Sequence, residues 1–547
     1  MKASDLFVKA LENEEVKYIF GIPGEENLDM LESLRLANIE MVVTRHEQAA
    51  GFMAATVGRL TGKVGVCMST LGPGATNFAT SAAYAQLGGM PMMMITGQKP
   101  IRKSKQGRFQ IVDIVKMMEP LTKSAKQIVD GAKIPAWVRE AVQLAETERP
   151  GAVHFEFPED IARDEVVAEI LPVSPVLKAQ VVSDDQLLAA AKMIKEAKKP
   201  LFLIGAGGNR NVDVANACNA FVEKTGMYFL DSQMGKGVID ERHPRYLGTT
   251  ALSANDFMHC ATDFADLVIV VGHDLIEKPP FIMSEGGPKV VHINHYQVDS
   301  DWVYEPDLQL VGDVADSLKR LTFELDGTDW DLGGYAKIRE NSEKETLRGA
   351  DDESFPMMPT RIVADVRKVM PEDGIICLDN GMYKLWFARH YKAYQRNTIL
   401  LDNALATMGA GLPSAMAAKL IFPDKKVMAI CGDGGFMMNS QEIETALRMK
   451  LDLVVLILND SGYQMIKWKQ ADMGFEDYSL DFKNPDFVKY AESYGAKGHK
   501  ITSVAEFETK LEECFAAGGV HLIDVPIDYS SNTEVSSSTL KTKSCPV

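Results

Sequence analysis

Short apolar runs alternate with helical patterns from the N-terminus to about residue 530 of this 547-residue chain. Examples in the first third are YIFGI at 18–22, VGVCM at 64–68 and AVHFEFP at 152–158. Aliphatic and β-branched runs of this length, bounded by Gly, Pro, Asn or Asp, are typical of buried parallel strands. Helices between such strands cover both faces of the sheet. We therefore predict an α/β chain made of doubly wound parallel sheets.

Two polar stretches divide this alternation into three segments. The stretch at 162–186 is polar and contains prolines, and the stretch at 326–356 is charged and lacks an apolar period. A chain of this length also corresponds to about three to four typical domains. The predicted parts are an N-terminal domain at 1–165, a central domain at 185–325, a C-terminal domain at 357–530 and a tail at 531–547. The tail has too little apolar content to fold alone, and we expect it to be mobile or to act as a lid.

Composition narrows the classes of partner and compartment. The formal net charge is −18, which argues against a nucleic-acid partner because such proteins need a basic face. The seven cysteines occur singly, without a C-x-x-C pair, and this suits neither a disulfide framework nor a zinc site. The N-terminus predicts an amphipathic helix followed by a strand, not a signal peptide, and no apolar stretch is long enough to cross a bilayer. We expect a cytoplasmic protein without a membrane partner.

The stretch 432–460, GDGGFMMNSQEIETALRMKLDLVVLILND, has two acidic residues at expected strand ends. Asp433 follows one apolar run and Asp460 follows the next, 27 positions later. Ligands of parallel α/β sheets bind beyond the carboxyl ends of strands, and two carboxylates there suit a hard cation that also contacts phosphate. Glycines at 432, 434 and 435 would let backbone N–H groups approach an anion. A glycine turn in an ordinary sheet is the alternative.

Asn439 and Glu442 are three positions apart in the same stretch. This is the spacing of a capping box, in which two side chains satisfy the free N–H groups of a helix start. The sequence therefore predicts that a helix begins at Asn439 and continues through Met449.

The pattern G-D-G, followed about 25 residues later by an Asn-Asp pair, resembles the fingerprint of thiamine-diphosphate enzymes. The resemblance implies that Mg²⁺ is held by Asp433, Asp460 and the backbone carbonyl of Gly462. It also implies that the cofactor diphosphate lies against Gly432, Gly434 and Gly435.

A second candidate residue is Glu47, at the expected strand–helix junction of TRHEQAAGFMAATVGRLTG. A helix-start glutamate favoured by the helix dipole is the ordinary interpretation. Its small and apolar neighbours Ala49, Ala50, Gly51 and Phe52 leave the carboxyl poorly solvated, which makes its protonated form easier to reach. HEQAAGFMA resembles the glutamate segment of thiamine enzymes. In that family this residue protonates the aminopyrimidine ring, whose imino form then removes the proton from thiazolium C2.

Further segments resemble one branch of this family, the acetohydroxyacid and acetolactate synthases. GPGATN at 72–77 matches the turn beside the cofactor pyrimidine, ATMGAG matches the segment whose methionine bends the cofactor, and GRFQ matches a Phe-Gln segment. The implied catalytic residues, besides Glu47, are Phe109, Gln110 and Lys123. The other implied cofactor contacts are Gly24, Pro73, Asn77, Gly381, Met382, Met408, Tyr463 and Met465.

Departures from the family pattern bear on the type of enzyme. Simple 2-oxoacid decarboxylases carry a His-His pair in the first domain, whereas His46 is the only histidine before His154 here. Flavin-containing synthases place arginines where this chain has Asp274 and Lys278, and an aspartate cannot pair with a flavin diphosphate. Trp468 follows Met465 by three residues, whereas the biosynthetic synthases place this tryptophan four residues after the methionine. The resemblance therefore does not define the pocket for the second 2-oxoacid. The segment GHDLIEKPP, which contains Asp274 and Lys278, is more similar to that of catabolic, FAD-independent synthases. Bound FAD is therefore not expected, although the glycine-rich GAGGNRN could cradle a dinucleotide.

The resemblance covers nearly the whole chain, from FGIPGEENLD at 20–29 to VHLIDVP at 520–526. It implies an enzyme that uses thiamine diphosphate and Mg²⁺ to decarboxylate pyruvate and join the hydroxyethyl carbanion to a second 2-oxoacid, giving 2-acetolactate and CO₂. Because family members build the site between the first domain of one chain and the third of another, a homodimer or homotetramer is expected. A non-ligating 2-oxoacid decarboxylase and a non-catalytic homologue remain the alternatives.

Overall fold

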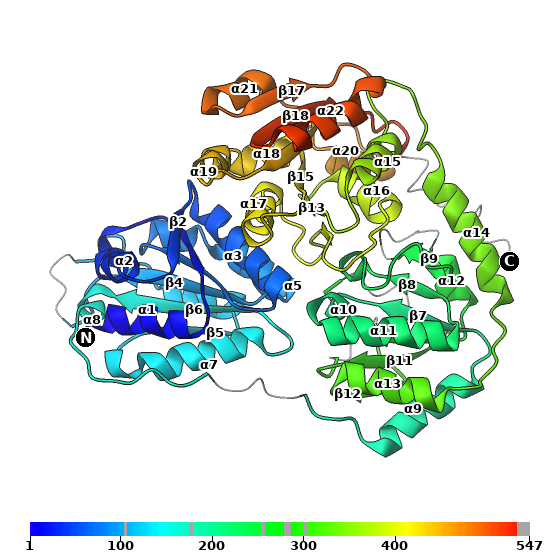
Figure 1. The fold of residues 1–547 in the computed structure, drawn as a ribbon, viewed down its shortest axis with the longest axis horizontal. Coiled ribbons are helices and arrows are strands. Elements are labelled where there is room, and N and C mark those ends of the chain that lie inside the picture. The colour runs from blue at the N-terminus through cyan, green and yellow to red at the C-terminus, as the bar shows by residue number, and fades with distance from the viewer. Residues whose placement is uncertain are drawn as a thin grey trace. The chain divides into compact units, whose positions relative to one another are not determined.

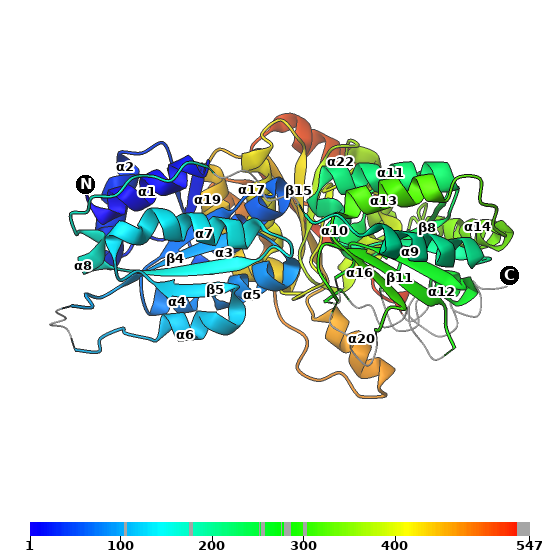
Figure 2. The same ribbon diagram turned by 90° about the horizontal axis from the view of Figure 1, so that it is seen from below.

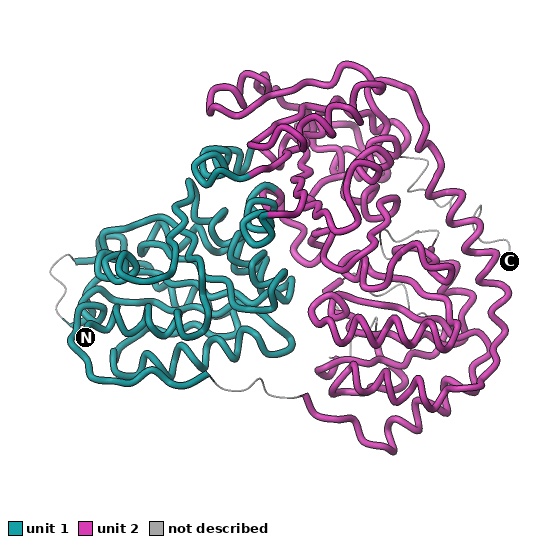
Figure 3. The backbone as a smooth tube through the Cα atoms, in the orientation of Figure 1, with its two compact units in different colours: residues 1–177, 412–423, 437–451 teal, residues 178–411, 424–436, 452–547 magenta. Residues whose placement is uncertain are grey.

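The computed structural model describes residues 1–102, 107–173, 179–250, 252, 258–274, 276–277, 286–298 and 304–532. It contains three six-stranded sheets, and every strand pair in them is parallel (Figures 1 and 2). The predicted α/β class and its doubly wound parallel sheets are thus confirmed. By its contacts the chain divides into two compact units (Figure 3). Unit 1 comprises residues 1–177, 412–423 and 437–451, and unit 2 comprises residues 178–411, 424–436 and 452–547.

The first sheet belongs to unit 1 and has the strand order β2-β1-β3-β4-β6-β5. Its strands are β1 (Tyr18–Gly21), β2 (Glu40–Val43), β3 (Gly65–Ser69), β4 (Met92–Gln98), β5 (Ser124–Gln127) and β6 (Ala152–Pro158). The helices of this unit are α1 (Ala3–Asn13), α2 (Leu28–Arg35), α3 (Glu47–Thr61), α4 (Pro73–Thr76), α5 (Ala79–Gly88), α6 (Ile114–Met118), α7 (Ile134–Glu146), α8 (Glu159–Ala162), α17 (Gly411–Ile421) and α19 (Glu442–Arg448). Phe7 of α1 stacks on Phe157 of β6, within the core that α1 and α7 form against one face of the sheet.

The second sheet belongs to unit 2 and has the order β12-β11-β10-β7-β8-β9. Its strands are β7 (Pro200–Ile204), β8 (Phe229–Asp231), β9 (Tyr246–Thr249), β10 (Leu267–Val271), β11 (Lys289–Asn294) and β12 (Leu308–Val311). Its helices are α9 (Asp184–Glu196), α10 (Gly207–Arg210), α11 (Val212–Thr225), α12 (His259–Phe264), α13 (Val314–Glu324) and α14 (Gly333–Leu347). Phe202 and Ile204 of β7 pack with α9, α11 and α13, whereas Leu201 and Leu203 pack with α12 and α14. Because successive strand residues point to opposite faces, an unbroken apolar strand serves two cores at once.

The third sheet, also in unit 2, has the order β14-β13-β15-β16-β18-β17. Its strands are β13 (Ile375–Leu378), β14 (Ile399–Leu400), β15 (Val427–Gly432), β16 (Leu453–Asn459), β17 (Lys497–Lys500) and β18 (Val520–Pro526). The remaining helices are α15 (Pro359–Val369), α16 (Met382–His390), α18 (Asp433–Asn439), α20 (Gln464–Asp472), α21 (Phe487–Tyr494) and α22 (Val504–Ala517). Helices α15, α16 and α22 share one apolar core with alternate residues of β13, β15, β16 and β18.

Five strands lack a counterpart in the sequence prediction: β5, β8, β9, β12 and β17. Four of these are sheet edges, where one side of the strand is not covered, so the strong apolar signal of an interior strand is absent. β5 (SAKQ) and β17 (KGHK) are polar throughout. The fifth, β8, has only three residues, too few for an apolar period to show.

The capping-box prediction at Asn439 is wrong. Asn439 is the last residue of α18, and the next helix, α19, begins at Glu442 with Gln441 as an N-cap that makes no side-chain bond. The Asn439 amide instead donates to Gln48 Oε1 at 3.1 Å. The Asn439 side chain therefore makes a tertiary contact and does not cap the start of α19, as its local spacing had predicted.

Two other stretches complete the comparison with the predicted organisation. The charged connection at 326–356 contains the helix α14, whose buried Tyr335 and Ile338 anchor it to the second sheet. The predicted tail at 531–547 lies almost wholly outside the described residues, so its role stays a prediction, as do the domain boundaries. None of the helices in the described part of the chain has the length and apolar content needed to traverse a bilayer.

Candidate active site

Asp433 lies where β15 ends, next to the end of the neighbouring strand β16. Gly432 is in register with Leu458, so both strands finish at the same edge of the third sheet. One Asp433 oxygen accepts the N–H of Gly434 at 2.8 Å, and the other accepts the N–H of Ser461 at 2.7 Å. The bond to Ser461 ties the turn after β15 to the turn after β16, as the sequence spacing predicted for two carboxylates at one sheet edge.

Asp460 stands beside this turn with a buried oxygen that has no partner. Among the described residues nothing forms a hydrogen bond to its Oδ2 atom. Burial and the nearby Asp433 charge raise the pKa of Asp460 to about 7, and burial also raises the pKa of Asp433. Two carboxylates that destabilise each other's charged form are relieved when a cation binds between them. The residues thus fit the Mg²⁺ site that the family resemblance implies.

Asn484 is a residue of this edge that sequence reasoning missed. Its amide donates to Asp433 Oδ2 at 2.7 Å and lies 3.0 Å from Asn459 Oδ1. Asn459 also donates to Asp524 Oδ1, at 2.8 Å. These amides fix the orientation of the Asp433 carboxylate. The 51 positions between Asp433 and Asn484 carry no local pattern that could have revealed the contact.

The predicted glycines occupy places where a side chain would collide. A Cβ at Gly434 would come within 2.8 Å of Tyr463 Cε1, and one at Gly435 within 2.5 Å of Asp379 Oδ2.

Asp379 is a second residue that sequence reasoning missed. It is buried, and its carboxylate accepts the N–H of Gly409, next to Met408, at 2.9 Å. Burial raises its pKa to about 6.

The other predicted cofactor contacts of the third domain follow the same sheet edge. Gly381 caps α16, and a Cβ there would meet the Tyr383 ring at 2.5 Å. Met382 is the first residue of α16, Tyr463 precedes α20, and Met465 lies within α20, a helix without buried residues. Gly462, the predicted carbonyl ligand, forms an antiparallel bridge with Asp481.

Glu47 opens α3 as predicted. His46 is the N-cap, with its Nδ1 accepting the N–H of Gln48 at 3.0 Å, and the Glu47 side chain is only 9% exposed. The Asn77 amide donates to Glu47 Oε2 at 2.9 Å, and a Cβ at Gly74 would lie 3.2 Å from Glu47 Oε1. The Gly-Pro-Gly turn therefore directs Asn77 toward one oxygen of the Glu47 carboxyl. At the other oxygen, Oε1, the turn has a glycine and so places no side chain.

The turn that contains Pro73 is fixed by the Phe-Gln segment and by the Gly24 loop. Gly72 has φ +48°, and a Cβ there would come within 2.6 Å of the Gln110 carbonyl. Gly24 packs against Thr70, where a Cβ would meet the Thr70 Cβ at 2.3 Å. All of these residues follow strands of the first sheet at its carboxyl edge, together with Glu47.

Phe109 and Gln110 differ from Lys123 in their position. Phe109 is 65% exposed, and Gln110 has φ +59° beside the Gly72 turn. Lys123 precedes β5 and its N–H donates to the first residue of β6, so it lies at the amino edge of the first sheet, opposite to Glu47. Its Nζ atom donates to the carbonyls of Thr147 and Arg149, and burial lowers its pKa to about 8. The structure thus does not bring Lys123 together with Glu47.

Glu442 is a third missed residue. Its carboxylate accepts the N–H of Arg45 and of His46, both at 3.0 Å, and the hydroxyl of Thr445 at 2.7 Å. The side chain is buried, and burial raises its pKa to about 7. Because Arg45 and His46 immediately precede Glu47, this carboxylate holds the connection that presents Glu47. All these contacts lie within unit 1.

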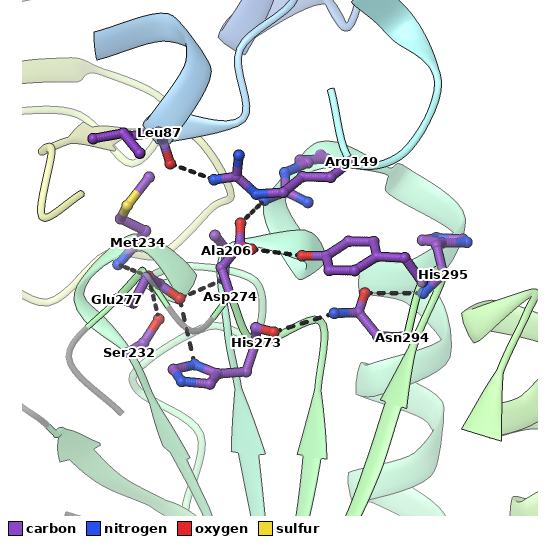
Figure 4. A network of polar contacts seen from close by, with 12 residues as sticks. Leu87, Arg149, Ala206, Ser232, Met234, His273, Asp274, Glu277, Asn294 and His295 are labelled. Carbon is purple, nitrogen blue, oxygen red and sulfur yellow. Dashed lines mark hydrogen bonds and ion pairs between the residues drawn. The ribbon is translucent and has the colours of Figure 1, made fainter. Parts of the chain in front are cut away.

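Two carboxylates of the central domain contact the glycine-rich segment GAGGNRN, at Ala206 and at Arg210. Buried Glu277 accepts the N–H of Ala206 at 3.1 Å, the Ser232 hydroxyl at 2.7 Å and the N–H of Met234 at 3.1 Å (Figure 4). Asp274 pairs with Arg210 and accepts the Tyr296 hydroxyl at 2.6 Å. Lys278 lies outside the described residues.

The glycine-rich turn of this domain has its own N–H groups occupied. Gly205 donates to Val271, Gly207 to Gly272 and Gly208 to Gly205, all through backbone carbonyls. Ala206 donates to Glu277 as described above. Each N–H from 205 to 208 therefore has a partner within the domain.

Comparison with known families matches three models along the chain. The thiamine pyrophosphate enzyme N-terminal TPP binding domain matches residues 1–117, the central domain matches 187–321, and the C-terminal TPP binding domain matches 379–525. Each model falls on one of the three sheets.

Curated relatives match over nearly their whole length. Acetolactate synthase of Bacillus subtilis is 31% identical, over 98% of this chain and 95% of the relative. The catabolic acetolactate synthase of Raoultella terrigena is 30% identical over 97% and 95%, and the acetolactate synthase isozyme 2 large subunit of Escherichia coli is 29% identical over 97% and 96%. With all three domains present and this similarity along the entire chain, the protein belongs to the acetolactate synthase family of thiamine pyrophosphate enzymes.

Proposed function

We propose that this protein is a thiamine-diphosphate- and Mg²⁺-dependent acetolactate synthase of the catabolic type. It would decarboxylate pyruvate and join the two-carbon fragment to a second 2-oxoacid, releasing CO₂ and 2-acetolactate. The observation that carries the proposal is the full-length similarity to acetolactate synthases in a chain that keeps Glu47, Asp433 and Asp460. A non-catalytic homologue has no physical need for all three.

Asp433, Asp460 and the Gly462 carbonyl would hold the Mg²⁺ ion. These are oxygen donors, which Mg²⁺ prefers, and the unpartnered Asp460 oxygen gives the ion a ready ligand. Asn484 would keep the Asp433 carboxylate oriented when the ion binds. When bound, thiamine diphosphate supplies the electron sink for decarboxylation.

Glu47 would hold and move a proton at a ring nitrogen of the bound cofactor. The carboxyl is buried at the start of α3, with one oxygen bonded to Asn77 and the other beside Gly74, where no side chain intervenes. A buried carboxyl with a free oxygen can act as a general acid and base. Phe109 and Gln110 would line the adjacent part of the pocket.

We propose that the enzyme works without FAD. The N–H groups of residues 205–208 all have partners in the domain, and the Glu277 carboxylate lies on the Ala206 N–H. A second carboxylate, Asp274, follows the next strand. An anionic diphosphate would meet the Glu277 carboxylate and an Asp274 already paired with Arg210 here, instead of free N–H donors.

A homodimer or homotetramer in the cytoplasm is part of the proposal. Glu47 belongs to unit 1 and Asp433 to unit 2. The family resemblance implies a site assembled from the first domain of one chain and the third domain of another. Both residues would then serve one cofactor only in an assembled protein.

Product analysis tests the proposal directly. Purified protein with thiamine diphosphate, Mg²⁺ and pyruvate should give 2-acetolactate, identified by mass, in a stoichiometry of one per two pyruvates. Free acetaldehyde as the main product would favour the alternative, a non-ligating decarboxylase. No turnover of pyruvate by a protein that binds the cofactor would refute both.

A further inference from the structure

A cluster of metal-binding side chains lies outside the candidate active site, at the edge of the third sheet. One nitrogen from each of His499 and His521 and the sulfur of Cys514 lie within 4.8 Å of one another. His499 is on β17, Cys514 on α22 and His521 on β18. Sequence reasoning did not find this cluster, because no two of these residues have the spacing of a known zinc motif.

The fold explains why these three residues meet. β17 and β18 are paired in parallel, with Lys497 opposite His521 and His499 opposite Ile523. Residues two apart on a strand share a face, so His499 and His521 lie diagonally on one face of the sheet. Cys514 is buried in the core that α22 forms against that same face, together with Ile523.

The hydrogen bonds determine which nitrogen of His521 is free to bind. His521 Nε2 lies 3.1 Å from the carbonyl of Gly518, which can only accept, so Nε2 carries the proton. The lone pair is therefore on Nδ1, which faces His499 Nε2 at 3.0 Å. A backbone carbonyl that fixes the tautomer of a histidine in this way is one of the common partners of a metal-ligating imidazole.

The nitrogen–nitrogen distance is close to that of a tetrahedral site, and the Cys514 sulfur lies within 4.8 Å of both nitrogens. At Zn–N bonds of about 2.0–2.1 Å, two nitrogens of one tetrahedron are about 3.4 Å apart, only about 0.4 Å more than the separation seen here. The imidazole rings are stacked at an interplanar angle of 10°, so an ion would be admitted by a shift of the half-buried His499 ring together with an approach of the Cys514 sulfur. A fourth position would remain for water or another ligand.

We propose that His499, Cys514 and His521 form a second metal site, which takes a borderline transition-metal cation such as Zn²⁺. One thiolate and two imidazoles suit Zn²⁺ and its analogue Co²⁺, whereas Mg²⁺ and Ca²⁺ need oxygen donors. The site is separate in chemistry from the carboxylate pair Asp433 and Asp460. Binding joins α22 to β17 and β18 and releases the thiol proton.

Cobalt titration of the full-length protein, saturated beforehand with Mg²⁺ and thiamine diphosphate, tests the proposal. The wild type should bind one Co²⁺ per chain with a thiolate-to-cobalt charge-transfer band, which an oxygen-only site cannot produce. Zn²⁺ should displace the Co²⁺ and raise the melting temperature relative to protein treated with a chelator.

Variants identify the ligands. Cys514→Ser should abolish the charge-transfer band, and His499→Gln should weaken Co²⁺ binding at least ~10-fold, the low end for perturbing a metal site. Cys218→Ser is the matched control, because Cys218 is a buried thiol among apolar residues of α11. It should keep the band. Should Cys514→Ser fail to fold, His499→Gln decides the matter, since His499 is half-buried on an edge strand.

The proposal is overturned if the wild type shows no charge-transfer band under these conditions. It is equally overturned if the band persists in Cys514→Ser, or if folded His499→Gln binds Co²⁺ as tightly as the wild type. Pyruvate turnover in Mg²⁺ should be unchanged in His499→Gln. Loss of both Co²⁺ binding and turnover, with no loss of fold, would contradict a site independent of the active site.

Discussion

Replacing Glu442 tests whether the connection before Glu47 is held from α19. In the wild type this carboxylate accepts two backbone N–H groups, those of Arg45 and His46, and the Thr445 hydroxyl. Glu442→Ala leaves both N–H groups without an acceptor, at about 1 kcal/mol each because the connection is partly exposed to water. The larger effect should be on catalysis. A displacement of about 1 Å at Glu47 can lower turnover ~10²-fold.

The assay is steady-state turnover of pyruvate with kcat and KM measured separately. We expect kcat of Glu442→Ala to fall by ~10- to 100-fold, with little change in the affinity for Mg²⁺ and thiamine diphosphate. Glu442→Gln keeps one acceptor oxygen and the size of the side chain, so its kcat should stay within a few-fold of the wild type. Glu444→Gln is the matched control, since Glu444 pairs with Arg448 on the surface of the same helix.

The pH dependence of stability gives a second readout. Burial raises the pKa of Glu442 from 4.5 to about 7, so the folded state favours its protonated form. The stabilisation that this preference adds to the free energy of unfolding is fully present below pH 4.5 and is lost as pH rises through about 7. Its size is about 3.5 kcal/mol, since a tenfold change in the proton-binding constant corresponds to about 1.4 kcal/mol. Urea unfolding of the full-length protein should show that the free energy of unfolding falls less for Glu442→Gln than for the wild type between pH 5 and pH 8.

Two results would refute this reasoning. One is a Glu442→Ala protein that is folded and turns over pyruvate like the wild type. The other is a Glu442→Gln protein with the wild-type pH dependence of unfolding, which would mean that Glu442 does not titrate in this range.

Three further predictions concern the proposed cofactor sites. Asp433→Ala should bind Mg²⁺ and thiamine diphosphate at least ~10-fold more weakly in calorimetry, and unchanged affinity would remove Asp433 from the ligand set. Glu47→Gln should bind the cofactor almost normally while turnover falls ~10²-fold or more, and hydrogen exchange at C2 of the bound cofactor, followed by NMR, should slow with it; wild-type exchange would make Glu47 a structural residue. The purified protein should be colourless with activity indifferent to added FAD, whereas a yellow protein that loses activity when stripped of flavin would contradict the assignment of Asp274 and Glu277.

The parts of the fold that sequence reasoning predicted are those whose signal is local. Interior strands such as β4 and β16 are buried on both faces and read as continuous apolar runs. The edge strands β5 and β17 are polar, because only pairing on one side holds them in the sheet. The Asp433–Asp460 pair was predictable for the same reason as the interior strands: one strand–helix–strand unit fixes the distance between two strand ends.

Residues whose bonding partners are distant in the sequence have no such local pattern. Glu442 contacts residues almost 400 positions away, and its local spacing to Asn439 indicated a capping box that the structure does not contain. Asn484 reaches Asp433 from a loop that follows α20. In both cases a polar side chain bonds to a turn that is distant in the sequence, a contact that only tertiary packing decides.

For Lys123 the family motif implied a catalytic position, but the structure places the residue away from Glu47. The Phe-Gln segment implied a catalytic lysine 13 positions after Gln110, yet the chain between them includes α6 and crosses from the carboxyl edge of the first sheet to its amino edge. There the ammonium group bonds to the carbonyls of Thr147 and Arg149, which accounts for its half-buried position without any substrate. A residue at the amino edge cannot reach a ligand at the carboxyl edge of its own sheet. Of this segment, Gln110 lies beside the Gly72 turn, at the same sheet edge as Glu47.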